Sequence, residues 1–228
     1  MPSLEQARAW YRDADPVHDF AHVLRVYRTA EQLALEEGAD LEIVRAAALL
    51  HDAQGSAPPG RPAAHHNQKS SGAGGEGVER ASHHHSSAEF AARVLAAEGW
   101  PAERIAAVQH CIRAHRFRDQ TEPPATLEAK ILFDADKLDV LGAIGVARAV
   151  AYAALDGQPF YAEPSPQFLE SGVAAPGEPH SSYHEYLFKL RKIKDRLFTA
   201  TARRMAEGRD AYLAGFYRRL AAEMRGEM

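Results

Sequence analysis

Several features are scarce in this chain of 228 residues, and each scarcity narrows what the protein can be. The single cysteine, Cys111, excludes an intrachain disulfide, and a reducing cytoplasm is the simplest expectation. No run of about twenty apolar residues is long enough to cross a membrane, and Met1–Arg12 has no apolar core resembling a signal peptide. The alternating pattern of half-buried strands is also missing. We therefore expect an all-α protein without a membrane partner.

A strong excess of charge of either sign is missing as well. The chain has 27 Lys and Arg residues against 31 Asp and Glu residues, a formal net charge of -4, which argues against binding to a nucleic acid polymer. Hydrophobic residues make up 46% and charged residues 25%, as in ordinary globular proteins. The length suffices for one sizeable core, so we expect residues 1–228 to form a single domain.

Against this background, histidine and aspartate residues lie on helix faces that are otherwise apolar. The run Leu41–Asp52 ends in His51-Asp52, and His51 shares a face with Val44 and Ala48 at helical spacing. A buried charge is costly unless it is paired or coordinates a metal, so partner groups are expected elsewhere in the chain.

Two other apolar helices supply such partners. His22 shares a helical face with Val26 and Ala30, and Asp136 shares one with Val140. Two neutral imidazoles and two carboxylates form a mixed nitrogen and oxygen set that suits a divalent ion such as Mn, Fe, Co, Zn or Mg. The predicted metal ligands are His22, His51, Asp52 and Asp136.

The order His, His-Asp, distant Asp resembles the HD-domain metal-dependent phosphohydrolases, in particular the small bacterial HD hydrolases related to YedJ and YpgQ. The sequence segments that carry the resemblance are residues 18–22, 112–117, 134–139 and 142–148. It implies an HD-domain helical bundle with a divalent metal near its middle. Manganese is the expected ion, with Mg, Co, Ni, Fe or Zn as alternatives.

The activity implied by this resemblance is a metal-dependent phosphohydrolase that uses a metal-activated water. We expect a nucleotide (NTP or dNTP) pyrophosphohydrolase or a nucleotide phosphatase, with a small phosphorylated substrate. A monophosphatase or phosphodiesterase remains open. A di-iron HD-fold oxygenase and a non-catalytic nucleotide-binding HD module are the alternatives from other classes. Family habit and the apolar C-terminal helices within residues 182–228 suggest a homodimer.

Phosphoryl transfer also needs cations near the metal to neutralise charge on the phosphoryl oxygens. Lys137 adjoins Asp136, and Arg148 would lie only about 20° away around one continuous helix, so we expect both at the site. A basic segment near the C-terminus resembles the lysine-rich segment of the family. The alternative is that its lysines lie on a solvated surface and contact no substrate. The expected substrate contacts there are Lys189, Lys192 and Lys194.

Three further residues are candidates for the reaction. His115 is expected to contact the phosphate or the leaving group, or to hold a second metal with one of His83 to His85. His18 lies one turn before His22 and is expected to contact substrate. Asp19 is expected to act as a general base or to orient a histidine ligand, with helix capping as the alternative. The predicted catalytic residues are thus Asp52, Asp19, His115 and Lys137.

The expected helices cover residues 4–12, 17–37, 41–52, 86–98, 100–115, 126–155, 182–207 and 210–224. A Gly- and His-rich stretch, residues 53–85, follows the His-Asp motif and is expected to be a flexible surface loop or a lid. Residues 158–179 are expected to form another loop. Gly142 and Gly145 are poor helix formers, and we expect them to allow the close approach of a neighbour.

Overall fold

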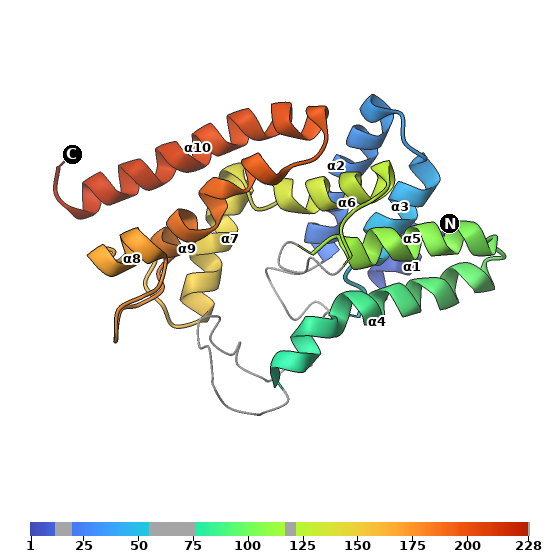
Figure 1. The fold of residues 1–228 in the computed structure, drawn as a ribbon, viewed down its shortest axis with the longest axis horizontal. Helices are drawn as coiled ribbons and strands as arrows, with labels where there is room; N and C mark the ends of the chain where they lie inside the picture. The colour runs from blue at the N-terminus through green and yellow to red at the C-terminus, as the bar shows by residue number, and fades with distance from the viewer. Residues whose placement is uncertain (12–19, 55–75, 117–121, 228) are drawn as a thin grey trace. The chain divides into compact units, whose positions relative to one another are not determined.

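A computed structural model of the chain describes residues 1–11, 20–54, 76–116 and 122–227, with the side chains of residues 76–83 left aside. Every regular element in these ranges is helical, which confirms the all-α prediction. The α-helices labelled in Figure 1 are α1 (Leu4–Arg8), α2 (Phe20–Glu37), α3 (Leu41–Leu50), α4 (Glu76–Ala97), α5 (Ala102–Ala114), α6 (Leu127–Leu138), α7 (Gly142–Leu155), α8 (Pro166–Ser171), α9 (Ser182–Phe188) and α10 (Ala200–Met224).

The described residues group into two compact units. Unit 1 contains the residues up to 54, residues 76 to 137 and the segment Leu197–Ala202. Unit 2 contains Leu138–Arg196 and the residues from Arg203 onward. The single domain expected from the sequence stays a prediction.

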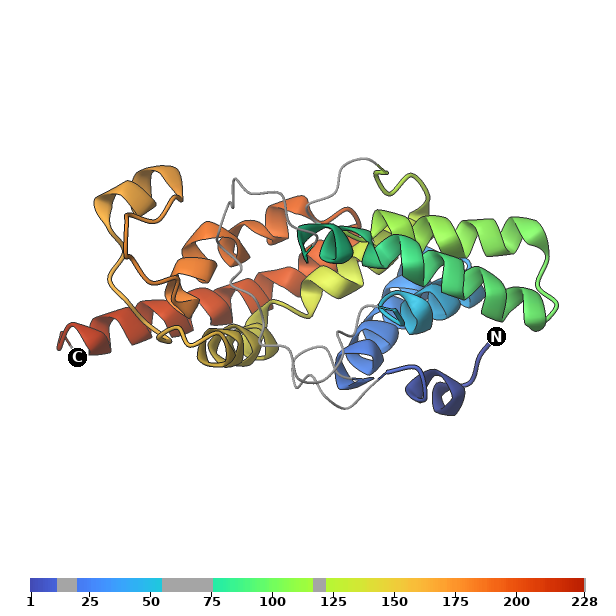
Figure 2. The ribbon, with the colours of Figure 1, turned by 90° about the horizontal axis from the view of Figure 1, so that it is seen from below.

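Unit 1 is built around α3. Helices α2, α4, α5 and α1 pack against α3, and α4 and α5 run side by side in opposite directions (Figure 2). Asp40 caps the N-terminus of α3, because its carboxylate accepts hydrogen bonds from the backbone N–H groups of Glu42 and Ile43. Gly38, with φ of 76°, ends α2 as predicted.

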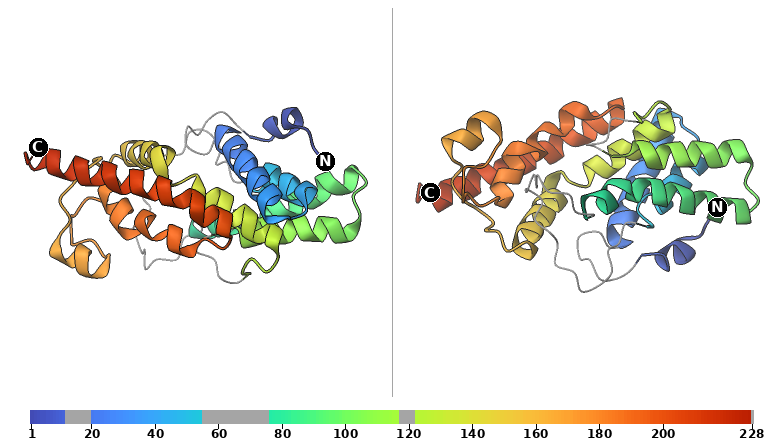
Figure 3. Two further views of the ribbon diagram at one scale, coloured as in Figure 1. Left: turned by 90° about the horizontal axis from the view of Figure 1, so that it is seen from above. Right: turned by 60° about the horizontal axis from the view of Figure 1, so that its bottom comes forward.

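Unit 2 contains α7, α8, α9 and nearly all of α10 (Figure 3). Tyr217 of α10 is fully buried, and its ring stacks on that of Tyr186 with centroids 4.6 Å apart. Tyr183 and Tyr161 extend this contact, with ring centroids 5.1 Å apart. Aromatic packing therefore joins α9 to α10 inside this unit.

The single long helix expected over residues 126–155 is wrong, because α6 ends at Leu138 and α7 begins at Gly142 as a separate helix. Gly142 takes the left-handed conformation, with φ of 70°, at the start of α7. Arg209 donates a hydrogen bond of 2.7 Å to the carbonyl of Leu138, which satisfies a backbone group at the end of α6. Lys137 and Arg148 therefore do not line one face of a single helix.

The predicted close approach of a neighbouring helix is borne out at Gly142, which adjoins Arg209 of α10, whereas the close neighbour of Gly145 is the preceding turn of its own chain. A Cβ atom on Gly142 would lie 3.2 Å from Cγ of Arg209, and one on Gly145 would lie 2.2 Å from the carbonyl oxygen of Val140. These positions bring the turn between α6 and α7 against its neighbours.

The expected start of α4 also differs. The helix begins at Glu76, so the Ser86-to-Glu89 capping box lies inside it rather than at its start. Ser87 is buried and accepts a hydrogen bond from the backbone N–H of Gln54. Ser87 therefore makes a tertiary contact, although it belongs to a capping-box pattern that predicts a helix start. Residues 55–75 of the expected loop 53–85 lie outside the described residues.

The C-terminal helices break at a different place from the one expected. Helix α9 ends at Phe188, two 3₁₀ turns follow at Leu190–Lys192 and Lys194–Arg196, and α10 then runs unbroken through Gly208. The expected loop 158–179 contains α8, which Ser165 caps by accepting the N–H of Phe168. Short capped helices of this kind are too brief to give a clear periodic pattern.

No single helix in the described ranges has both the length and the hydropathy needed to cross a membrane. Helices α6 and α7 meet those criteria only as a bent pair. Such a pair is weak evidence, since buried core helices meet the same criteria.

The backbone contact at Gly145 leads to a stability prediction. Gly145→Ala should lower the free energy of unfolding by about 2 kcal/mol, because the new methyl group would overlap the carbonyl of Val140. Gly208→Ala is the matched control: a Cβ there meets nothing within 4 Å, so better helix propensity should add about 0.5–1 kcal/mol. Urea unfolding followed by circular dichroism measures both, and equal stabilities would contradict the packing described here.

Candidate metal centre

Three of the predicted ligands meet in unit 1. One ligand atom each from His22 of α2, His51 at the end of α3 and Asp136 of α6 lie within 4.8 Å of one another. His22 and His51 are buried, and His22 Nε2 is 3.5 Å from Asp136 Oδ1. The structure thus brings these three predicted ligands together.

Asp52, the fourth predicted ligand, lies beside the same histidines. Its Oδ2 atom is 3.4 Å from His51 Nε2 and 3.9 Å from His22 Nε2. Two carboxylates and two imidazoles therefore share one largely buried space. Their role as metal ligands stays a proposal, which the arrangement of their atoms supports.

The ring of His51 is oriented by the end of its own helix. His51 is the C-cap of α3, and its Nδ1 is 2.8 Å from the carbonyl oxygen of Ala48. A carbonyl only accepts, so Nδ1 carries the proton and Nε2 of the neutral ring carries a lone pair. Nε2 is buried and has no hydrogen-bond partner among the described residues. A divalent ion fits this donor set, because it would accept that lone pair.

His115 makes the same kind of hydrogen bond at the end of α5. It is the C-cap of that helix, and its Nδ1 lies 2.5 Å from the carbonyl oxygen of Ile112. Its Nε2 is 3.7 Å from Asp52 Oδ1, and its ring centroid is 5.3 Å from that of His51. His115 therefore lies beside the cluster. It approaches Oδ1 of Asp52, whereas His22 approaches Oδ2.

The electrostatics of the cluster favour ionised carboxylates and a neutral His115. Burial alone would raise the pKa of Asp136, but the charge of Lys137 and the nearby imidazoles hold that pKa well below its usual range. The pKa of Asp52 is likewise lowered, because His51, His115 and His22 outweigh the effect of burial. Burial lowers the pKa of His115 to about 3. Deprotonated groups of both kinds are what a metal ion requires.

Lys137 lies directly at the cluster. Its ammonium group forms an ion pair with Oδ2 of Asp136, the carboxylate oxygen that does not face His22. The same ammonium lies 5.2 Å from the centroid of the Phe133 ring. Asp136 is thus held from one side by a cation and presents its other oxygen to the histidines.

The remaining predicted cations belong to unit 2, where most have partners. Arg148 pairs with the buried Asp139 at 2.6 Å, and Lys189 pairs with Glu185 at 2.8 Å. Lys194 pairs with Asp210 at 2.6 Å. Lys192 lies 5.5 Å above the ring of Phe188. Their assignment as substrate contacts stays a prediction.

Some predicted site residues fall outside the described part of the chain. His18, Asp19 and the side chain of His83 are among them. His84 lies on α4 rather than in a loop, is 1% exposed, and contacts the ring of His85 in a tilted arrangement with centroids 4.2 Å apart.

Tyr11 contacts the site in a way that the sequence did not suggest. Its buried hydroxyl donates a 2.7 Å hydrogen bond to the carbonyl of Leu49, near the end of the helix that delivers His51. Burial and the charge of Asp52 raise the pKa of Tyr11. An aromatic residue three positions beyond the end of a short N-terminal helix gives no local signal for such a contact.

The buried neutral state of His115 predicts an acid-sensitive fold. The folded pKa of about 3 lies below the value of about 6.5 expected in the unfolded chain, so below pH 6.5 the unfolded chain binds a proton that the folded protein does not. Between pH 7 and pH 5, this lowers the free energy of unfolding of chelator-treated protein by on the order of 2 kcal/mol. The lowered pKa values of Asp52 and Asp136 act only at lower pH.

Urea unfolding at several pH values tests this sign and size. His115→Gln should flatten the dependence on pH between 7 and 5 by about that amount, because the titrating group is gone. A variant with the wild-type pH slope would show that His115 titrates normally in the folded protein.

Comparison with known proteins gives the family. Residues 19–141 match the family described as HD domain. The chain is 31% identical to the uncharacterized protein YpgQ of Bacillus subtilis (strain 168), over 99% of this chain and 96% of that protein. It also resembles the crystal structure of Bacillus subtilis YpgQ in complex with ADP, with 27% identity, a TM-score of 0.68 and coverage of 99% and 100%.

An HD-superfamily hydrolase from Bacillus thuringiensis has a similar structure, with 25% identity, a TM-score of 0.64 and coverage of 97% of this chain and 96% of that one. The sequence match and these structures agree with the cluster of histidine and aspartate side chains in unit 1. The chain therefore belongs to the HD-domain family, and its structural neighbours include an HD-superfamily hydrolase.

Proposed function

We propose that the protein is a divalent-metal-dependent nucleotide phosphohydrolase that splits a nucleoside triphosphate into the monophosphate and pyrophosphate. The observation that carries the proposal is the meeting of His22, His51 and Asp136 within 4.8 Å, with the lone pair of His51 unpartnered. A buried polar atom aimed into a cluster of ligand-type groups is otherwise costly.

His22, His51, Asp52 and Asp136 would hold the ion. Bound there, a divalent ion would polarise a phosphoryl oxygen and lower the pKa of a water, which supplies a nucleophile near neutral pH. Manganese is our first choice and Mg, Co, Ni, Fe or Zn are alternatives, because a mixed nitrogen and oxygen set does not select one ion.

Neighbouring residues of the chain orient the proposed ligands and offset the negative charge of Asp136. The Ala48 carbonyl fixes the ring of His51, and Lys137 holds Asp136 so that one oxygen faces the histidines. With Nδ1 committed to the Ile112 carbonyl, neutral His115 accepts at Nε2 and does not donate. We therefore assign His115 to accept a proton or hydrogen bond at the site, rather than to donate one to a phosphoryl oxygen.

A nucleotide substrate is supported by two separate observations. The relative Bacillus subtilis YpgQ has been crystallised in complex with ADP. In unit 2 of this chain, Lys192 makes no ion pair among the described residues, and its ammonium is available to an anion while it lies over Phe188. We assign Lys192 to the phosphate groups, with Lys189, Lys194 and Arg148 as further contacts that would have to leave their carboxylate partners.

The second candidate function is a di-iron oxygenase. The observation that favours it is His115 Nε2, 3.7 Å from Asp52 Oδ1, since Asp52 would then lie between two sets of histidines. Two iron atoms per chain after purification, with oxygen consumption and no phosphate release, would support this candidate instead.

The main test is turnover by chelator-treated protein with Mn, Mg, Co or Ni and a panel of nucleoside mono-, di- and triphosphates. Pyrophosphate release from a triphosphate is the expected result. His51→Ala and Asp136→Ala should each lower kcat/KM roughly a hundredfold or more, because each removes a proposed ligand.

His110→Gln is the matched control for these variants. His110 lies on α5 and bonds to Glu122 at 2.7 Å, away from the cluster, so activity should be unchanged. Wild-type activity in the His51 and Asp136 variants would overturn the site. A protein that binds one metal but hydrolyses no substrate would be the nucleotide-binding module instead.

Lys192 gives a separate prediction for substrate binding. Lys192→Ala should raise KM about tenfold with little change in kcat, because one charge contact to phosphate is lost. Arg219→Ala removes the same charge from an exposed pair with Glu223 on α10 and should leave KM unchanged. Steady-state kinetics at fixed ionic strength measure both, and equal KM values would remove Lys192 from the site.

A further inference from the structure

Asp134 lies on α6 two residues before Asp136 and has no exposed surface. Its carboxylate accepts hydrogen bonds from the backbone N–H of Phe198 at 2.9 Å and the backbone N–H of Thr199 at 2.8 Å. The hydroxyl of Thr199 also donates to it at 2.7 Å. Such charge-assisted bonds are about twice as strong as neutral ones, and this carboxylate makes them within unit 1.

The residues bound by Asp134 stand at the beginning of α10. Thr199 caps this helix, because its Oγ1 accepts the backbone N–H of Ala202 at 3.3 Å. The N–H of Thr201 bonds to Glu37 of α2 at 2.7 Å. The segment Leu197–Ala202 is therefore fastened to both α6 and α2.

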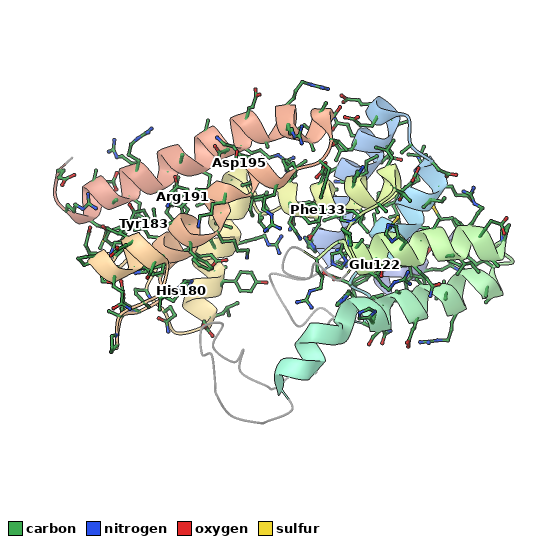
Figure 4. All side chains as sticks on the ribbon, in the orientation of Figure 1. Glu122, Phe133, His180, Tyr183, Arg191 and Asp195 are labelled. Carbon is green, nitrogen blue, oxygen red and sulfur yellow. The ribbon has the colours of Figure 1, made fainter. Side chains whose placement is uncertain are left out.

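A second contact joins the same segment to α6. The rings of Phe198 and Phe133 meet edge to face with centroids 5.0 Å apart, and Figure 4 labels Phe133 on α6. The ammonium of Lys137 lies over the Phe133 ring and pairs with Asp136. Phe198 is thus linked through packed side chains to the cation that holds Asp136.

The need for such fastening follows from the place of Asp136 in its helix. Helix α6 ends at Leu138, so Asp136 lies in the last turn, where helices fray most easily. Side chains two residues apart on a helix are rotated by about 200° about its axis, so they point to nearly opposite sides. A bond that fixes Asp134 on one side of α6 therefore fixes the rotation that presents Asp136 on the other side.

We propose that Asp134 and Thr199 form a clamp that positions Asp136 for metal binding. Asp134 is a positioning residue, because it acts through α6 and through Asp136 rather than on the ion. The inference rests on the proposed function, in that it requires a divalent ion at His22, His51 and Asp136.

Direct metal titration tests the clamp without relying on turnover. Calorimetry with Mn²⁺ and the visible absorption spectrum of the Co²⁺-loaded protein are measured for wild type and four variants of the full chain. Asp134→Asn should weaken Mn²⁺ binding about tenfold and shift the Co²⁺ bands, as loss of partners beyond the ligands does elsewhere. Thr199→Val should do the same more weakly, and Thr199→Ser, which keeps the hydroxyl, should restore wild-type affinity.

Asp40→Asn is the control for a purely structural role. Asp40 also caps a helix of unit 1, at the end of α3 remote from His51, so its substitution should change neither Mn²⁺ affinity nor the Co²⁺ spectrum. Affinities within twofold of wild type in both Asp134→Asn and Thr199→Val would overturn the clamp, while metal binding by wild type itself leaves the proposed function standing. If Asp134→Asn does not fold, the pair Thr199→Val and Thr199→Ser decides. A wild-type protein that binds no divalent ion would overturn the proposed function and the clamp together.

Discussion

The proximity of two part-buried carboxylates to the same buried histidines is the constraint on which the rest of unit 1 depends. Asp52 and Asp136 share a space with His22 and His51, and each carboxylate would be expensive to ionise there without positive charge nearby. Their lowered pKa values show that the surrounding groups overcome that cost. A divalent cation is the partner that such a set of ionised oxygens and imidazole lone pairs binds most naturally.

Backbone groups at helix ends set the geometry of this space. The last carbonyls of α3 and α5 lack partners within their helices, and the Nδ1–H groups of His51 and His115 satisfy them. Each imidazole then has only Nε2 left to face the carboxylates. On α6 the polarity is reversed, because the carboxylate of Asp134 takes up N–H groups at the start of α10. The hydrogen bonds that satisfy backbone groups at the helix ends therefore also orient the residues of the site.

The three aspartates near the end of α6 show how much of this could be predicted from sequence. Helical spacing and the family-like order identify Asp136 as the residue that meets His22 and His51. The roles of Asp134 and Asp139 were not predictable. Asp134 binds Phe198 and Thr199, which are distant in the sequence, and Asp139 binds Arg148 across a helix break. The breaks before α7 and α10 were missed for the same reason, since tertiary hydrogen bonds rather than local propensity determine them.

The central claim is that His22, His51 and Asp136 bind a single divalent ion together with Asp52. Anomalous diffraction from crystals of the protein loaded with Mn²⁺ tests it most directly, because the signal locates the ion independently of any activity. The account predicts one strong peak at ordinary coordination distance from Nε2 of His22, Nε2 of His51 and a carboxylate oxygen of Asp136. A peak that lies elsewhere, or no peak under conditions that saturate binding, would contradict it.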